Sequence, residues 1–223
     1  MESLVGEAIA GRRDEVFLVS KVLPQNASRD GTIKACEKSL KRLRTDRLDC
    51  YLLHWRGRIA LEETVAGFER LQQDGKILSW GVSNFDADDL DEIARLAGPP
   101  ACNQVLYHLK ERAIEHRVLP WCETHGTAVV GYSPFGSGDF PSGGSAGGRA
   151  LAEIGAAHGV TARAVALAFL VRRPALFTIP KASWPDHAAE NARAGSVTLS
   201  DAEIARIDEA FPRGRAPRSL PMI

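Results

Sequence analysis

The sequence predicts an α/β fold in which parallel strands alternate with helices. Short apolar runs such as Leu48–Trp55 recur between amphipathic segments, as expected for strands that are buried on both faces of a sheet. Six of these strand-like runs follow one another at intervals of about 25–30 residues, and no linker interrupts the alternation. We therefore expect one domain over residues 1–223.

The first part of the chain contains three predicted strands, each preceded by a helix. Apolar residues at helical spacing predict helices over residues 2–11, 28–44, 61–75 and 86–96. The predicted strands are 16–22, 48–55 and 78–84. Ser28 is the predicted N-cap of the second helix, and the Gly98–Pro100 stretch ends the fourth.

The alternation continues to the end of the chain. The predicted strands are 103–108, 128–135 and 176–182, and the predicted helices are 115–125, 149–158, 161–172, 185–194 and 199–211. Ser200 and Glu203 form a capping box that opens the last helix. The tail from Pro212 onward is rich in proline and arginine, which is incompatible with regular structure throughout.

This alternation favours a (β/α)₈ barrel over a doubly wound sheet. A doubly wound sheet that binds a dinucleotide needs a glycine-rich turn, and neither GxGxxG nor GxxxxGK[ST] occurs. A complete barrel has eight strands and typically about 250 residues, whereas only six strands are recognisable here. Because the chain opens on a helix in mid-pattern, we expect a TIM barrel that lacks its first two strands.

Composition argues against several classes of function. Basic and acidic residues both number 28, so no net charge favours nucleic acid or an anionic membrane. No apolar run approaches the roughly 18 residues that span a bilayer, and the first residues lack the apolar core of a signal peptide. The cysteines lack CxxC spacing, which predicts buried thiols, no metal site and a reducing, cytoplasmic location; they are Cys36, Cys50, Cys102 and Cys122.

Chemically useful side chains stand at the carboxyl ends of predicted strands, where barrel enzymes place their active sites. Gln104 lies within its strand, and the strand-end residues are Lys21, His54, Ser83, Asn84, Tyr132, Ser133 and Lys181. Burial disfavours the charge of Lys21, so this lysine could form a Schiff base or lower the pKa of a neighbouring acid. His54 could act as an acid, a base or a hydrogen-bond donor to a carbonyl oxygen. Taken singly, these residues could equally be a surface lysine and a core histidine.

Two segments could bind phosphate. Gly136–Gly148 is rich in glycine and serine and leads into a helix, a junction that can present backbone N–H groups to an anion. The same composition is typical of a flexible linker. Lys181–Pro185 joins a strand end to a helix that begins with proline, where backbone donors and Lys181 could meet a phosphate.

In combination, six segments resemble the aldo-keto reductases, in particular the small bacterial members that reduce dicarbonyls and sugar-derived aldehydes. They are LVSKV, LDCYLLHW, GKILSWGVSNF, NQVLYH, VVGYSPFGSG and IPKASWPDHAAEN. The resemblance runs from about residue 2 to residue 223, and WGVSNF together with IPKAS is its most specific part. It implies an oxidoreductase that transfers a hydride from NADPH, with NADH not excluded, to the carbonyl of a small aldehyde, ketone or dicarbonyl.

The resemblance also implies a role for each site residue. Lys21 matches the lysine whose charge lowers the pKa of a proton-donating tyrosine, and His54 matches the histidine that polarises the carbonyl. Trp55 would border the substrate pocket. The residues matched to the nicotinamide are Ser83, Asn84 and Gln104 at the carboxamide and Tyr132 as the stacking aromatic. Those matched to the pyrophosphate are Ser133, Pro134, Phe135 and Ser137, and those matched to the adenosine end are Lys181, Ala182, Ser183, His187, Glu190 and Asn191.

The chain departs from the family pattern in two ways. His187 stands where many NADPH-preferring members place an arginine against the 2′-phosphate, so the choice between NADPH and NADH stays open. The DxAxxYG-type motif that carries the catalytic aspartate and tyrosine is absent, and the tyrosines present are Tyr51, Tyr107 and Tyr132. A general acid typically contributes about 10²–10⁴-fold. We therefore expect an amino-terminally truncated reductase of impaired activity that is monomeric or weakly dimeric.

Two alternatives remain at this point. A non-catalytic relative that binds the nicotinamide cofactor, as a pseudoenzyme or a regulatory module, would retain Ser83, Asn84, Gln104 and Tyr132. A different barrel enzyme, such as a lyase that uses Lys21 as a Schiff-base amine, would have no evident need for the GVSNF and IPKAS segments.

Overall fold

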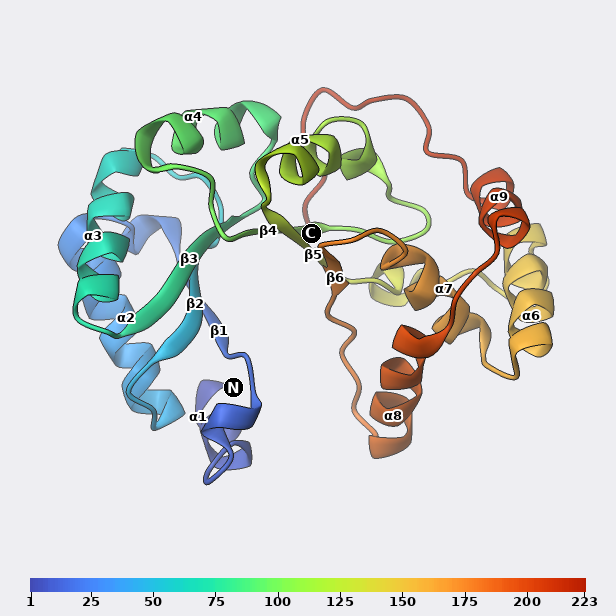
Figure 1. Cartoon of the computed structure of the whole chain (residues 1–223), viewed down its shortest axis with the longest axis horizontal. Coiled ribbons are helices and arrows are strands. Elements are labelled where there is room, and N and C mark those ends of the chain that lie inside the picture. Colours follow the sequence, from blue (N-terminus) through green and yellow to red (C-terminus); the bar gives the residue numbers. More distant parts are fainter. The chain divides into compact units, whose positions relative to one another are not determined.

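Strands alternate with helices throughout the computed structural model, which describes residues 1–223 (Figure 1). The strands are β1 (Val19–Val22), β2 (Leu48–Leu53), β3 (Ile77–Ser83), β4 (Cys102–Leu106), β5 (Ala128–Tyr132) and β6 (Leu176–Thr178). Their order in the sheet is their order in the sequence, and β1–β2, β2–β3 and β5–β6 pair in parallel. The predicted α/β class is thus confirmed.

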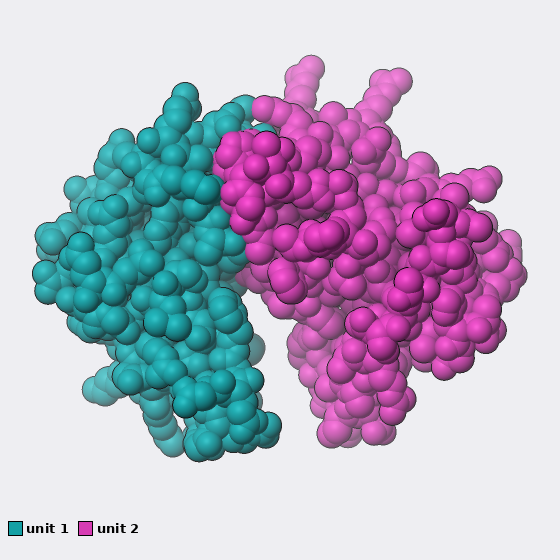
Figure 2. Space-filling model, in the orientation of Figure 1, with its two compact units in different colours: residues 1–103 teal, residues 104–223 magenta.

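The chain divides into two compact units, Met1–Asn103 and Gln104–Ile223 (Figure 2). The helices of unit 1 are α1 (Glu2–Ala8), α2 (Arg29–Leu43), α3 (Leu61–Gln73) and α4 (Ala87–Ala97). Those of unit 2 are α5 (Val118–His125), α6 (Ala146–His158), α7 (Ala162–Leu170), α8 (Pro185–Arg193) and α9 (Asp201–Ala210). A single domain over residues 1–223 stays a prediction.

In unit 1, β2 is the centre of the core. It pairs with β1 on one side and β3 on the other, and five of its six residues are buried, as expected when helices cover a parallel sheet. Helices α2 and α3 lie side by side and bury Leu40, Leu43 and Phe68 (Figure 1). The ring of Phe68 stacks on Trp80 of β3, with 5.7 Å between the ring centroids. The apolar faces of both helices are therefore turned toward the sheet.

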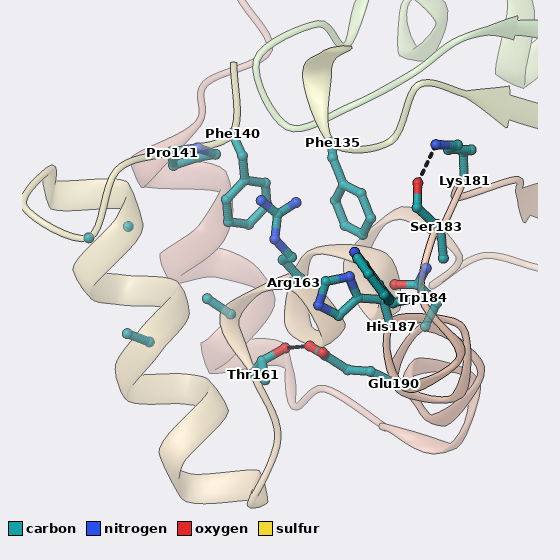
Figure 3. A pocket seen from close by; sticks show the side chains of 16 residues that line it. Phe135, Phe140, Pro141, Thr161, Arg163, Lys181, Ser183, Trp184, His187 and Glu190 are labelled. Carbon is teal, nitrogen blue, oxygen red and sulfur yellow. Dashed lines mark hydrogen bonds between the residues drawn. The ribbon is translucent and has the colours of Figure 1, made fainter. Parts of the chain in front are cut away.

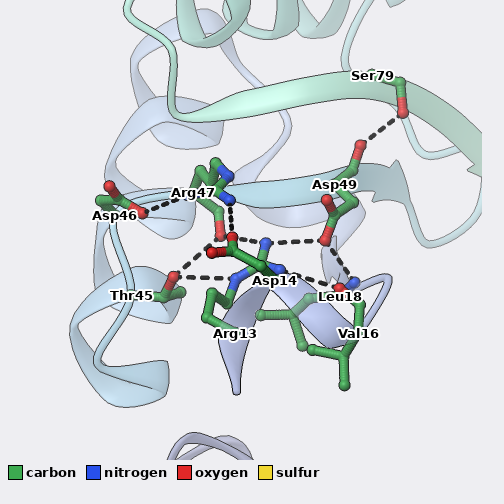
Figure 4. Close-up of polar contacts among 9 residues, drawn as sticks. All are labelled: Arg13, Asp14, Val16, Leu18, Thr45, Asp46, Arg47, Asp49 and Ser79. Atoms are coloured by element: carbon green, nitrogen blue, oxygen red, sulfur yellow. Dashed lines mark hydrogen bonds and ion pairs between the residues drawn. The ribbon is translucent and has the colours of Figure 1, made fainter. Parts of the chain in front are cut away.

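A polar cluster around Asp49 fixes the beginning of β1 (Figure 4). The Asp49 carboxylate accepts hydrogen bonds from the Leu18 backbone amide at 2.7 Å and from the Arg13 guanidinium at 2.8 Å. Arg13 also donates to the Val16 carbonyl oxygen at 3.0 Å. The predicted strand over residues 16–22 was therefore too long, because side chains satisfy backbone groups of Val16 and Leu18 and the paired strand begins at Val19.

Other element ends deviate from the prediction as well: β5 ends at Tyr132 and not at residue 135, β4 ends at Leu106 and not at residue 108, α1 ends at Ala8 and not at residue 11, and α5 begins at Val118 and not at residue 115. Local contacts explain two further deviations. Strand β6 ends at Thr178 and not at Ala182, since Pro180 has no N–H group to donate to a sheet. Helix α6 begins at Ala146, three residues earlier than expected, because the Ser145 side chain accepts a hydrogen bond from Gly148. The predicted caps at Ser28 and Ser200 are confirmed.

The cysteines and the helix lengths bear on the compositional predictions. All four cysteines are free; Cys36, Cys50 and Cys122 are buried as expected, whereas Cys102 is partly exposed. No cluster of three or more histidine, cysteine, aspartate or glutamate side chains is suited to bind a metal ion. None of the helices has both the length and the apolar character that a membrane span requires.

In unit 2, a buried ion pair joins three segments. Both oxygens of Glu115 accept from the Arg112 guanidinium, at 2.9 and 2.7 Å, and the Tyr107 hydroxyl donates to the same carboxylate at 2.6 Å. Arg172, which follows α7, donates to the Tyr107 oxygen at 3.0 Å. Arg112 also donates to the carbonyl oxygen of Phe211 at 2.7 Å, at the end of α9. These bonds supply the partners that a buried carboxylate requires.

Replacing Glu115 by glutamine tests this cluster. Burial alone would raise the pKa of Glu115, but the hydrogen bonds from Arg112 and Tyr107 outweigh it and lower this pKa to about 2. The stabilisation is therefore present above the unfolded pKa of about 4.5 and is lost as the pH falls toward 2. We expect Glu115→Gln to lower the free energy of unfolding by about 3 kcal/mol at pH 7, measured by urea denaturation.

The difference between this variant and the wild type should shrink as the pH falls from about 4.5 toward 2. Glu123→Gln is the matched control, because Glu123 pairs with Arg173 at the surface and should cost less than about 1 kcal/mol. A loss for Glu115→Gln that is no larger than that of the control would contradict the importance of the buried pair.

Candidate active site

The carboxyl ends of β1, β2 and β3 bring four of the predicted site residues to one edge of unit 1. Lys21 pairs with Leu52, and Leu52 pairs with Gly81, so the three strand ends are level. His54 follows β2 directly, and its backbone amide donates to the Val22 carbonyl oxygen at 2.9 Å. Ser83 is the last residue of β3 and Asn84 follows it. In unit 1, the predicted strand-end placement of these side chains is correct.

The positive charge of Lys21 acts on His54. Burial lowers the pKa of the Lys21 ammonium below its ordinary value. The pKa of His54 is lowered as well, first by burial and second by the positive charge of Lys21. His54 is consequently neutral at pH 7 and carries one ring N–H group that can donate to a carbonyl oxygen.

Asn84 fixes the position of His54. Its backbone adopts the left-handed conformation, with φ of 60°, which asparagine tolerates better than most residues. In this conformation the side-chain amide donates to the His54 carbonyl oxygen at 3.1 Å and to the Ser83 hydroxyl at 3.2 Å. The ends of β2 and β3 are thereby joined. The ring of Trp55 lies 4.7 Å from the His54 ring and is 38% exposed, so it offers an apolar surface beside the imidazole.

In unit 2, the strand-end residues lie on β4 and β5. Gln104 is buried within β4 at 5% exposure, and Tyr132 ends β5 with its ring partly exposed. Burial raises the pKa of Tyr132, and the backbone amide of Ile223 is hydrogen-bonded to the phenol. The irregular carboxyl-terminal tail therefore reaches the Tyr132 side chain.

The loop that follows Tyr132 is strained. Ser133 and Ser137 both have positive φ, of 53° and 52°, a conformation that costs a non-glycine residue free energy and is common at functional sites. The short helical turn Gly136–Gly138 brings the two hydroxyl groups within 3.1 Å of each other. Pro134 and Phe135 lie between these serines in the sequence. The residues matched to the pyrophosphate are thus close together in space.

A pocket of about 770 Å³ in unit 2 collects the residues matched to the adenosine end (Figure 3). The predicted residues that line it are Phe135, Lys181, Ala182, Ser183, His187, Glu190 and Asn191. Lys181 donates to Ser183, and Thr161 donates to Glu190. Helix α8 buries none of its residues, so its polar side chains are open to a ligand. The predicted strand-end position of Lys181 is wrong, since β6 ends three residues earlier.

Sequence reasoning missed other residues of this pocket. The further lining side chains that Figure 3 labels are Phe140, Pro141, Thr161, Arg163 and Trp184. A signal existed for Arg163, because it is the only charged residue of α7 and the seven residues after it in the helix are all buried. Nothing in the local sequence indicates that Phe140 lies beside Arg163.

Tyr51, the only tyrosine of unit 1, is not available as a proton donor at the Lys21–His54 edge. Tyr51 is fully buried and its hydroxyl lacks a hydrogen-bond partner, while burial raises its pKa. Tyr107 belongs to unit 2, where it is buried and donates to Glu115. Tyr132 also belongs to unit 2. Within unit 1, no tyrosine is therefore placed as a general acid.

Parallel strands that place a lysine and a histidine at their carboxyl ends are typical of barrel enzymes, which build their active sites at this face. The family model described as the aldo/keto reductase family matches residues 1–211. The chain belongs to this family.

Similar proteins agree with this assignment. A methylglyoxal reductase of Escherichia coli is 46% identical over 224 residues, covering all of this chain and 79% of its own length. A glyoxal reductase of Bacillus subtilis is 32% identical, covering 88% of this chain and 68% of its own length. The crystal structure of an aldo-keto reductase from Klebsiella pneumoniae in complex with NADPH has 44% identity and a TM-score of 0.93 over all of this chain and 79% of that one. The predicted barrel type is confirmed.

The electrostatic link between Lys21 and His54 can be measured directly. Replacing Lys21 by methionine removes a positive charge that disfavours the imidazolium, so the pKa of His54 should rise. It should stay below 6.5, because burial is the larger cause of the shift. The measurement is an NMR titration of the His54 imidazole. Lys38→Met, at an exposed position of α2, should leave this pKa unchanged. An equal shift in both variants would refute the link.

Proposed function

We propose that this protein reduces small aldehydes, ketones or dicarbonyls with NADPH, and that compounds of the methylglyoxal class are its substrates. The observation that carries the proposal is the neutral His54, fixed by Asn84 and lying within the electrostatic influence of Lys21. Membership of the aldo/keto reductase family and the 46% identity to a methylglyoxal reductase support it. NADPH is supported by its presence in a similar structure from Klebsiella pneumoniae.

The residues of unit 1 would act on the carbonyl group. His54 donates its ring N–H to the carbonyl oxygen, which makes the carbonyl carbon more electrophilic and stabilises the negative charge that develops on the oxygen. Lys21 adds a positive charge that favours the same oxyanion. Trp55 offers an apolar surface for the rest of a small substrate. The bound cofactor supplies the hydride; the product is the alcohol once a proton reaches the oxygen.

The remaining residues would bind the cofactor. Ser83, Asn84 and Gln104 have the hydrogen-bonding groups that a carboxamide needs, and Tyr132 offers a ring face. Ser133 and Ser137 would contact the pyrophosphate through hydroxyl and backbone donors. Around the pocket of unit 2, Lys181 and Ser183 would bind phosphate, and Glu190 and Asn191 would bind the adenosine end. His187 would lie beside them.

Proton transfer to the carbonyl oxygen is the step for which these 223 residues offer the least support. Tyr51, the only tyrosine of unit 1, is fully buried and away from solvent, so we propose that the chain by itself turns over slowly. A protein that binds the cofactor without turnover is the second candidate, and the buried positions of Tyr51 and Tyr107 favour it. The free thiols support our further proposal of a reducing, cytoplasmic location. We also propose a monomer or weak homodimer that binds neither nucleic acid nor membranes.

The test is a titration of the 223-residue protein with NADPH, followed by fluorescence, and an assay of NADPH oxidation with methylglyoxal. We expect saturable binding. We expect the oxidation rate to be about 10²–10⁴-fold below that of the Escherichia coli methylglyoxal reductase under the same conditions, because a positioned general acid contributes this much.

Lys21→Met and His54→Ala should lower the remaining oxidation rate further and leave NADPH binding within about threefold, since neither side chain is assigned to the cofactor. Absence of NADPH binding by the wild type would refute the proposed function. A rate equal to that of the Escherichia coli enzyme would show that another group supplies the proton. Binding with no oxidation at all would favour the second candidate.

A further inference from the structure

The most unusual side chain of the pocket in unit 2 is Arg163. It is the second residue of α7, and its guanidinium carbon lies 4.8 Å from the ring centroid of Phe135 and 4.5 Å from that of Phe140. Figure 3 shows the guanidinium between these two rings, on the wall of the pocket. No carboxylate forms an ion pair with it. Aromatic rings therefore hold this cation, and no anion of the chain neutralises it.

This arrangement leaves the hydrogen-bonding capacity of Arg163 available. A cation–π contact uses the charge of the guanidinium and not its hydrogen bonds, so N–H donors of the group remain for an anion. The contact with two rings also restricts the rotamers of a long side chain, so less conformational freedom is lost when an anion binds. Arg163 is exposed, and its donors are accessible from the pocket. It is thus prepared for a two-bond contact with a phosphate.

The neighbours of Arg163 indicate the charge of the ligand. Lys181 and His187 line the same pocket from the segment after β6 and from α8. The carboxylate that lines the pocket belongs to Glu190, which accepts a hydrogen bond from Thr161. Basic groups therefore outnumber acidic ones. The exposed ring of Trp184 and the ring of Phe140 add surfaces on which a purine could lie.

We propose that Arg163 binds the 2′-phosphate on the adenosine ribose of NADPH and so makes the protein prefer NADPH to NADH. His187 offers an imidazole, which lacks the paired donors of a guanidinium. Arg163 supplies a guanidinium to the same pocket from a different helix. This inference rests on the proposed function and assigns the cofactor preference to one residue.

The experiment uses two pairs of ligands that differ only in the 2′-phosphate: 2′,5′-ADP with 5′-AMP, and NADPH with NADH. Binding to the 223-residue protein is measured by calorimetry for the fragments and by fluorescence for the dinucleotides. Arg163→Ala should raise the dissociation constants of 2′,5′-ADP and NADPH by about 10- to 100-fold, since charge-assisted hydrogen bonds are lost. The dissociation constants of 5′-AMP and NADH should change by less than about threefold.

Three further variants separate the phosphate contact from other roles of Arg163. Arg163→Lys retains a charge but not the planar fork, and its NADPH affinity should lie between those of the wild type and Arg163→Ala. His187→Ala should keep most of the preference for NADPH. Arg206→Ala is the matched charge control, because Arg206 lies outside the pocket and pairs with Glu153 at the surface; it should change nothing.

The inference would be overturned if Arg163→Ala weakened the binding of both ligands of each pair equally, because this would indicate a packing role only. An unchanged preference in Arg163→Ala, or a preference that His187→Ala abolishes, would also overturn it. In these outcomes the wild type still binds NADPH, and the proposed function stands. A wild type that binds none of the four ligands would overturn both.

Discussion

The buried pair of Arg112 and Glu115 is the interaction on which unit 2 depends. A carboxylate at 7% exposure is costly unless its oxygens find donors, and this one receives them from Arg112, Tyr107 and Arg172. The donors belong to different segments, so burial of one carboxylate joins the connection after β4 to the end of α7. The bond from Arg112 to Phe211 adds the end of α9.

This cluster also anchors the carboxyl-terminal end of α7, the helix whose amino-terminal end lines the pocket. Helix α7 ends beside Arg172, and its first turn is capped by Thr161, which in turn donates to Glu190 of α8. Residues 164–170 of the helix are apolar and buried, so they hold the helix in the core but offer no side-chain hydrogen bonds that fix its orientation. The polar contacts at its two ends do so. With the helix held in this way, Arg163 lies against Phe135, and α8 lies beside the first turn of α7.

Unit 1 uses the same principle with fewer groups. Asp49 lies near the beginning of β2 and binds both Arg13 and the backbone amide of Leu18. Since the strand that follows Leu18 pairs residue by residue with β2, this contact determines that Lys21 lies opposite Leu52. Asn84 performs the corresponding task at the other end of the strands by binding the His54 carbonyl oxygen. Lys21 and His54 are therefore positioned by backbone contacts at opposite ends of β2.

The alternation of strands and helices was predictable because it depends on local apolar periodicity. The ends of the elements were less predictable, since they depend on single contacts such as those of Ser145 and Asp49. Site residues at strand ends, such as Lys21 and His54, follow from the order of elements. The lining of the unit 2 pocket could not be predicted in this way, because Phe135, Phe140 and Arg163 come together only in the folded chain.

The comparison of positions 163 and 187 shows why a residue-by-residue resemblance can miss a function. From such a resemblance an arginine is expected at position 187, where the sequence has a histidine. A phosphate responds to the place and direction of N–H donors, whatever position in the chain supplies them. In this protein Arg163 of α7 and His187 of α8 line the same pocket. Under the proposed assignment, the guanidinium of α7 takes the role for which the family pattern uses an arginine at position 187.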